Sequence, residues 1–192
     1  MKKAIRIIAG LGNPEERYER TLHNAGFWFV DAVARKFGGQ FRYEKKFDAE
    51  ICRVPVHGED LWLVKPQSYM NHSGPPVRGM LDYYRLRVAQ LLVAHDEIDL
   101  SPGTVRIKDG GGHGGHNGIR DVMRHCGADF LRLRLGVGHP GEKDQVTNYV
   151  LKRGSSETEA AIERNIDETI AVMPELVEGD VNAAMKKLHT KD

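Results

Sequence analysis

The chain has 192 residues, of which 40% are hydrophobic and 29% are charged, with 28 Lys and Arg against 27 Asp and Glu. These values are typical of a globular protein and exclude collagen, a long coiled coil and extended disorder. A chain of this length buries about 70% of its unfolded surface, so we expect one domain spanning residues 1–192.

Two further features bear on where the protein works. No apolar run approaches the roughly 20 residues that cross a bilayer, so no membrane association is expected. Cys52 and Cys126 are far apart in the sequence and fit no metal-ligand or redox spacing. A reducing, cytoplasmic location is the simplest interpretation.

The charge is uneven along the chain. The net charge of +1 argues against indiscriminate nucleic-acid binding. Residues 101–153, however, hold nine Lys and Arg against five Asp and Glu, a net charge of +4, whereas residues 154–192 hold four against nine, a net charge of −5. An anionic partner is therefore expected to meet residues 101–153, although unevenly charged solvated faces explain the pattern about equally well.

In chain order, the predicted elements alternate between strands and helices. Buried or alternating apolar runs predict strands at residues 5–11, 47–56, 61–65, 91–95, 105–108 and 131–137. Apolar residues three and four apart predict helices at residues 24–37, 77–84, from about 117 onward, 157–173 and 180–188. Loops are expected at residues 57–60, 67–76 and 110–115. The alternation predicts an α/β fold with a mixed, mostly parallel sheet flanked by helices.

Polar side chains follow several of the predicted strands. Asn13, Asn71, Asp96 and Asn117 each come after a strand, and His23 lies just ahead of the first helix. Ligands of open α/β sheets bind outside the carboxyl ends of the strands. These residues are therefore predicted to meet in one crevice.

This set of side chains suits acid–base hydrolysis. A neutral His23 can take a proton from water, and the adjacent helix N-terminus helps to keep it neutral. Asp96 can hold the other ring nitrogen and stabilise the cation that forms, while carboxamides donate to a carbonyl or oxyanion. Each residue also has a structural interpretation as a cap, a turn residue or packing, so only their coincidence favours a site.

Several familiar motifs are incomplete. The glycines at residues 10–15 lack the third glycine of a dinucleotide-binding turn, and the loop at 110–115 lacks the Gly-Lys-Ser/Thr end of a P-loop. There is no Gly-x-Ser-x-Gly motif for a nucleophilic serine. A zinc site at His95, His113 and His116 is conceivable, but a glycine loop holds metal ligands poorly.

With these residues in view, the sequence closely resembles the bacterial peptidyl-tRNA hydrolases from about residue 5 to residue 151. The motifs that carry the resemblance are Gly-Leu-Gly-Asn-Pro at 10–14, His-Asn-Ala-Gly at 23–26, Tyr-Met-Asn at 69–71, Ala-His-Asp-Glu-Ile-Asp at 94–99, Gly-Gly-His-Gly-Gly-His-Asn-Gly at 111–118 and Gly-Val-Gly-His-Pro-Gly at 136–141. The last 40 residues are only loosely characteristic.

The resemblance implies hydrolysis of the ester between a peptide and the 3′-terminal ribose of tRNA, in a single α/β domain without a metal or other cofactor. It implies that His23 is the proton acceptor, that Asp96 stabilises its basic form, and that Asn13 distinguishes N-blocked peptidyl-tRNA from free aminoacyl-tRNA. Contacts to the tRNA 3′ end and the peptide are implied for Tyr18, Tyr69, Asn71 and Asn117, with Met70 and His116 lining the same cleft. The implied partner is the acceptor stem and 3′ end of peptidyl-tRNA, met by a monomer.

The resemblance also implies that Lys108, Arg134 and Lys143 contact tRNA phosphates, in line with the positive charge of residues 101–153. Two residues depart from the family pattern: Glu15 stands where Gly usually follows the Pro, and His72 stands where Leu is common. Glu15 is expected to alter the loop that carries Asn13.

Two other hypotheses make different predictions. A non-catalytic RNA-binding module on the same fold would bind tRNA without hydrolysing the ester. A metal hydrolase built on His95, His113 and His116 would lose its activity on chelation, whereas the esterase hypothesis predicts no effect of chelators.

Overall fold

A computed structural model describes residues 2–189 and shows a seven-stranded sheet in the order β2-β3-β4-β1-β5-β7-β6. The strands are β1 (Ile7–Gly10), β2 (Arg42–Glu44), β3 (Ala49–Val56), β4 (Glu59–Pro66), β5 (Leu91–Glu97), β6 (Val105–Asp109) and β7 (Leu131–Gly136). β1 pairs in parallel with β4 and β5, and β5 pairs in parallel with β7, whereas β2, β3 and β6 enter through antiparallel pairs. The predicted α/β fold with a mixed sheet is confirmed. Three of the six strand pairs are parallel, so the expected parallel pairing holds for the four central strands β4, β1, β5 and β7.

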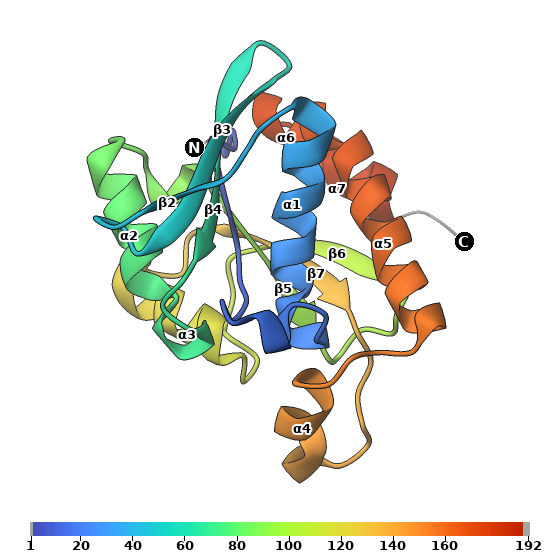
Figure 1. Ribbon diagram of the computed structural model, residues 1–192. Helices are drawn as coiled ribbons and strands as arrows, with labels where there is room; N and C mark the ends of the chain where they lie inside the picture. The colour runs from blue at the N-terminus through green and yellow to red at the C-terminus, as the bar shows by residue number, and fades with distance from the viewer. Residues whose placement is uncertain (1, 190–192) are drawn as a thin grey trace.

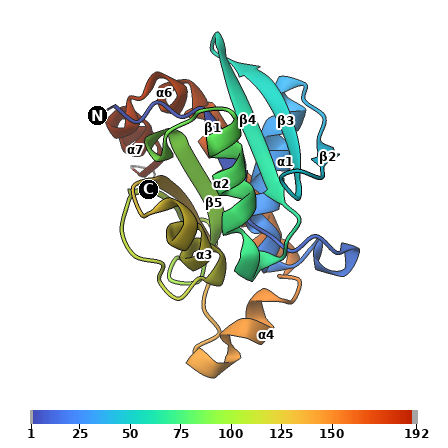
Figure 2. The same ribbon diagram turned by 90° about the vertical axis from the view of Figure 1, so that its left-hand side faces the viewer.

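Helices cover both faces of this sheet. The longer ones are α1 (Ala25–Phe37), α2 (Gly74–Tyr83), α3 (Asn117–Cys126), α5 (Ser156–Ala171), α6 (Met173–Glu178) and α7 (Val181–His189). α1, α5, α6 and α7 lie on one face (Figure 1), and α2 and α3 lie on the other (Figure 2). Successive residues of β1 point to opposite layers, so Ile8 joins the core under α1 while Ile7 joins the core under α2. No helix among residues 2–189 is long and apolar enough to cross a membrane.

The sequence did not predict two of the elements. β2 is a three-residue edge strand with an exposed face, too short for a periodic signal. The short helix α4 (Val146–Val150) projects away from the sheet beyond the lower end of α1 in Figure 1, with Val150 as its only buried residue. Neither element carries the run of apolar residues that hydrophobic periodicity detects.

Several predicted boundaries are wrong for local reasons. The turn between β3 and β4 has two residues rather than four, because His57 and Gly58 both take left-handed backbone angles and pair Val56 with Glu59. The predicted loop at 67–76 contains a 3₁₀ turn (Met70–His72) and the start of α2, where prolines are tolerated in the first helical turn. The helix predicted at 157–173 continues as α6, which has Pro174 in its own first turn.

Candidate active site

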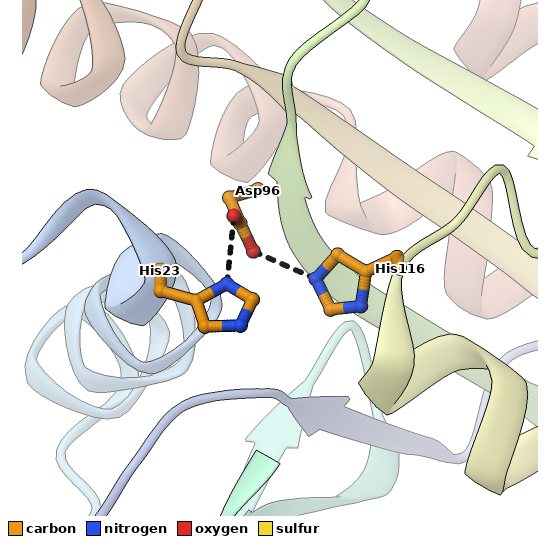
Figure 3. Close-up of side chains that lie close together, drawn as sticks. All are labelled: His23, Asp96 and His116. Carbon is orange, nitrogen blue, oxygen red and sulfur yellow. Dashed lines mark hydrogen bonds and ion pairs between the residues drawn. The ribbon is translucent and has the colours of Figure 1, made fainter. Parts of the chain in front are cut away.

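The centre of the site is a buried carboxylate shared by two histidines. Asp96 lies near the end of β5, is 3% exposed, and contacts one histidine with each oxygen. His23 Nδ1 lies 2.8 Å from Oδ2, and His116 Nε2 lies 2.7 Å from Oδ1 (Figure 3). His23 comes from the 3₁₀ turn (Leu22–Asn24) that precedes α1, and His116 caps the start of α3. Three segments far apart in the sequence therefore meet on one side chain.

The hydrogen bonds define the tautomers of both rings. An ionised carboxylate only accepts hydrogen bonds, so His23 carries its proton on Nδ1 and leaves Nε2 as a free base. His116 donates from Nε2 to Asp96, and its Nδ1 accepts from the backbone N–H of Ile119 at 3.3 Å. Both ring nitrogens of His116 are therefore in use, whereas His23 keeps one nitrogen available for proton transfer.

Electrostatics favour a basic His23. Burial alone would lower the pKa of His23, but the charge and the hydrogen bond of Asp96 raise it above 6.5. Burial alone would raise the pKa of Asp96, but the two imidazoles hold it well below its usual range, so this side chain stays ionised. The helix N-terminus was expected to lower the pKa of His23, but the Asp96 carboxylate has the larger effect because it contacts the ring directly.

A glycine allows His23 to approach Asp96. A Cβ atom on Gly26, in the first turn of α1, would lie 2.3 Å from the carbonyl oxygen of Ala94 and 2.5 Å from the backbone nitrogen of Leu11. Only a residue without a side chain lets α1 rest this closely on β1 and β5. The same close approach brings the turn that carries His23 to the end of β5.

Asn13, which follows β1, is held by its neighbours in one orientation. Its Oδ1 accepts from the backbone N–H of Met70 at 2.8 Å, which leaves the Nδ2 donors for a substrate. Asn24 anchors the Asn13 backbone, accepting from its N–H at 2.8 Å and donating to its carbonyl at 3.0 Å. Sequence reasoning gave no role to Asn24, although it stands next to His23 in the His-Asn-Ala-Gly motif. It is 1% exposed, and no local pattern indicated that burial.

The predicted substrate contacts differ in their exposure to solvent. Tyr69 and Asn71 belong to the segment after β4 and are exposed, whereas Met70 is buried in the core under α2. Asn117 is exposed and is the first residue of α3, as predicted. The residue that caps the helix is His116. Tyr18 is half-buried at the end of the 3₁₀ turn that follows Asn13.

The sequence predicts that the strand at 105–108 ends beside Asp96, and the structure shows that this step is wrong. β6 is antiparallel to β7. The chain therefore leaves β6 at Asp109, which pairs with Leu131 at the other end of the strands from Asp96. The glycine loop then carries the chain back to α3. Arg132, which alternates with the leucines of β7, is only 2% exposed. Its guanidinium donates to the carbonyl of Gly112 and so ties the glycine loop to β7, and it also donates to the carbonyl of Ala128 just before β7.

The three predicted phosphate contacts come from three different elements. Lys108 is on β6, Arg134 is on β7, and Lys143 is in the 3₁₀ turn before α4. Lys108 and Lys143 are exposed, but Arg134 Nε donates to Glu97 Oε1 at 2.9 Å. Any contact between Arg134 and a phosphate would therefore compete with an existing ion pair.

Among residues 2–189, the groups that could hold a metal ion are His23, Asp96 and His116, whose ligand atoms lie within 4.8 Å of one another. The zinc site considered from the sequence is not assembled: His113 Nδ1 accepts from its own loop at Gly115 N, and His95 Nδ1 contacts the Asp96 carbonyl. Burial, with the neighbouring His116, lowers the pKa of His95 to about 4, so this ring is neutral.

Comparison with known proteins identifies the family. Residues 7–192 match the family model described as peptidyl-tRNA hydrolase. The chain belongs to the peptidyl-tRNA hydrolase family. The peptidyl-tRNA hydrolase of Halorhodospira halophila is 51% identical over 96% of this chain and 95% of its own length, and that of Xanthomonas euvesicatoria is 48% identical over 98% of each. The crystal structure of the Acinetobacter baumannii peptidyl-tRNA hydrolase superposes with a TM-score of 0.97 at 41% identity, over 100% of this chain and 98% of that one.

Proposed function

We propose that this member of the peptidyl-tRNA hydrolase family cleaves the ester between the peptide carboxyl end and the 3′-terminal ribose of N-blocked peptidyl-tRNA. The observation that carries the proposal is the free Nε2 of His23, on a ring held by the buried Asp96. Asn24, the next residue in the chain after this histidine, anchors the backbone of Asn13, whose amide is oriented by Met70 N. A histidine held by a carboxylate and beside amide donors suits activation of water against an ester.

In the proposed mechanism, His23 Nε2 takes a proton from water as the water oxygen adds to the ester carbonyl. Asp96 stabilises the imidazolium that forms. The tetrahedral intermediate then collapses, the bond to the ribose 3′ oxygen breaks, and that oxygen receives the proton from His23. The products are free tRNA and the peptide carboxylic acid, which releases its proton to solvent as a carboxylate, so no reactant other than water is needed.

We assign the remaining residues to recognition. Asn13 Nδ2 donates to the peptide backbone and selects N-blocked substrates, because peptide side chains vary and only the backbone is constant. Tyr18, Tyr69, Asn71 and Asn117 hold the tRNA 3′ end and the peptide, with Met70 and His116 beneath them. Lys108, Arg134 and Lys143 meet phosphates of the acceptor stem, which is recognised by charge and shape rather than sequence. The proposed form is a cytoplasmic monomer.

The function is tested with two substrates on one tRNA in excess EDTA, an N-acetyl-aminoacyl ester and the free-amine aminoacyl ester. Rapid cleavage of the blocked ester alone is the expected result. Loss of cleavage in EDTA would support a metal hydrolase, and tRNA binding without cleavage in either buffer would support a non-catalytic RNA-binding module. Asn13→Ala should reduce the preference for the blocked ester, and an unchanged preference would remove the role assigned to Asn13.

A further inference from the structure

Two loops that carry proposed substrate contacts are tied together at two points. The loop after β1 carries Asn13 and Glu15, and the loop after β4 carries Tyr69 and Met70. The inner tie is the buried bond from Met70 N to Asn13 Oδ1. The outer tie is on the surface, where the Tyr69 hydroxyl donates to Glu15 Oε1 at 2.6 Å. Glu15 is one of the two residues that depart from the family pattern, so the outer tie depends on a residue for which the resemblance implies no role.

We propose that Glu15 is a positioning residue for substrate binding, which fixes the Tyr69 ring at the mouth of the site through this hydrogen bond. The pair Glu15–Tyr69 is called the latch below. The inference rests on the proposed function, because it takes Tyr69 to be a substrate contact. It assigns to Glu15 a role in setting the affinity for the tRNA 3′ end or the peptide, and none in the chemical step.

The backbone and exposure of Tyr69 show why such a latch has an effect. Tyr69 has φ 68°, a left-handed conformation that a residue with a large side chain seldom adopts. Tyr69 is 44% exposed. Without a partner, an exposed tyrosine samples several rotamers, and ordering it on binding reduces affinity. The latch removes this cost because it holds one orientation before the substrate arrives.

The latch also determines which part of Tyr69 is available. Its hydroxyl is committed to Glu15, so the face of the ring is left to pack against a base or a peptide side chain. Arg17 completes the arrangement, because its Nε lies 3.0 Å from Glu15 Oε2 and its guanidinium lies 4.7 Å from the centre of the Tyr18 ring. The positive charge of Arg17 offsets that of Glu15, which would otherwise repel an anionic substrate.

The test is the KM and kcat for N-acetyl-aminoacyl-tRNA of the wild type, Glu15→Ala, Tyr69→Phe, the double variant and Glu15→Gln. Each single variant removes the same bond and should raise KM about three- to tenfold, with kcat within about twofold, since a surface hydrogen bond contributes about this much. The double variant should be no worse than the poorer single one. Glu15→Gln should stay close to the wild type, because its amide oxygen still accepts from the phenol.

Three outcomes would overturn the proposal: an unchanged KM in Glu15→Ala, multiplying effects in the double variant, or a Glu15→Gln as weak as Glu15→Ala. A shared fall in melting temperature would also overturn it, since that would make the bond purely structural. Failure of the latch leaves wild-type hydrolysis intact, whereas failure of the proposed function abolishes it. If hydrolysis is absent, the Kd for deacylated tRNA replaces KM, because this measurement needs no turnover. The same pattern across the variants is then expected: weaker binding in Glu15→Ala and Tyr69→Phe, no further loss in the double variant, and near wild-type binding in Glu15→Gln.

Discussion

At the scale of single residues, the site depends on how one carboxylate is divided between two rings. Asp96 offers one oxygen to each histidine, yet the two rings have different uses. His116 has both nitrogens occupied, so it orients Asp96, while His23 has a free nitrogen and can exchange protons with substrate. This asymmetry supports the proposal that His23 is the base and suggests that His116 is a positioning residue.

The raised pKa of His23 predicts the acidic side of the pH profile. A base must be unprotonated to act, and the Asp96 carboxylate outweighs burial and raises the pKa of His23 above 6.5. The value of kcat/KM should therefore fall with decreasing pH, with a midpoint above 6.5. Asp96→Asn removes the charge and should move the midpoint down and slow the reaction strongly. A midpoint that does not move in Asp96→Asn would show that Asp96 does not set the basicity of His23.

His116 has two roles that substitution can separate. His116→Ala and His116→Asn both remove the hydrogen bond to Asp96 and should lower kcat/KM equally, by about 10- to 100-fold, as for a hydrogen bond to a charged group. Asparagine is a good helix N-cap, so only the alanine variant also loses the cap of α3. His116→Asn should therefore melt about 2–4 °C above His116→Ala. Unequal rates in the two variants would argue against a role through Asp96.

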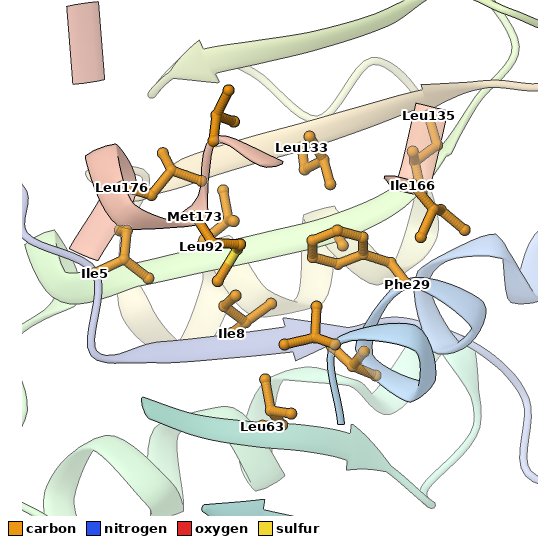
Figure 4. Close-up of a cluster of buried hydrophobic side chains, with 14 of the residues drawn as sticks. Ile5, Ile8, Phe29, Leu63, Leu92, Leu133, Leu135, Ile166, Met173 and Leu176 are labelled. Carbon is orange, nitrogen blue, oxygen red and sulfur yellow. The ribbon is translucent and has the colours of Figure 1, made fainter. Parts of the chain in front are cut away.

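At the scale of the elements, the position of α1 decides whether the site forms. Its apolar face is fixed by packing, with Phe29 in one cluster with Ile8, Leu92 and Leu133 of the sheet and Ile166 of α5 (Figure 4). Its first turn is fixed by the contact of Gly26 with β1 and β5. The helix therefore holds its 3₁₀ extension, and with it His23, at a set distance from Asp96.

Gly26→Ala tests this contact. The new Cβ would lie within 2.5 Å of two backbone atoms that cannot move aside like a flexible side chain. We expect a loss of at least about 2 kcal/mol in unfolding free energy and a large loss of activity as His23 moves from Asp96. The control is Gly79→Ala in α2, where the Cβ would meet only the Phe47 ring at 3.3 Å. That variant should stay within about 1 kcal/mol of the wild type. Equal stabilities in the two variants would contradict the account.

The elements also show what the sequence could and could not predict. The helices and central strands followed from periodic apolar residues, and the strand ends indicated Asn13, Asp96 and His23. The direction of β6 did not follow, because a short strand has the same pattern in either orientation. Nor did the burial of Arg132, since one of its two partners, the carbonyl of Gly112, lies in the glycine loop on the far side of α3.

At the scale of the whole molecule, charge should govern the encounter with tRNA. Residues 101–153 carry a net charge of +4 and include the exposed Lys108 and Lys143. If each meets one phosphate, Lys108→Ala and Lys143→Ala should each reduce the slope of log(kcat/KM) against log salt by about 1. Lys45→Ala, next to β2 at the other edge of the sheet, should leave the slope unchanged. Equal slopes in all three variants would rule out these two contacts.

The central claim is that His23 is the general base, and it is tested most directly by the single-turnover rate of His23→Ala on N-acetyl-aminoacyl-tRNA. The account predicts a loss of about 10²–10⁴-fold, as for removal of a general base, with tRNA affinity and melting temperature near those of the wild type. A rate within tenfold of the wild type would contradict it, since the free nitrogen beside Asp96 would then play no part in the cleavage.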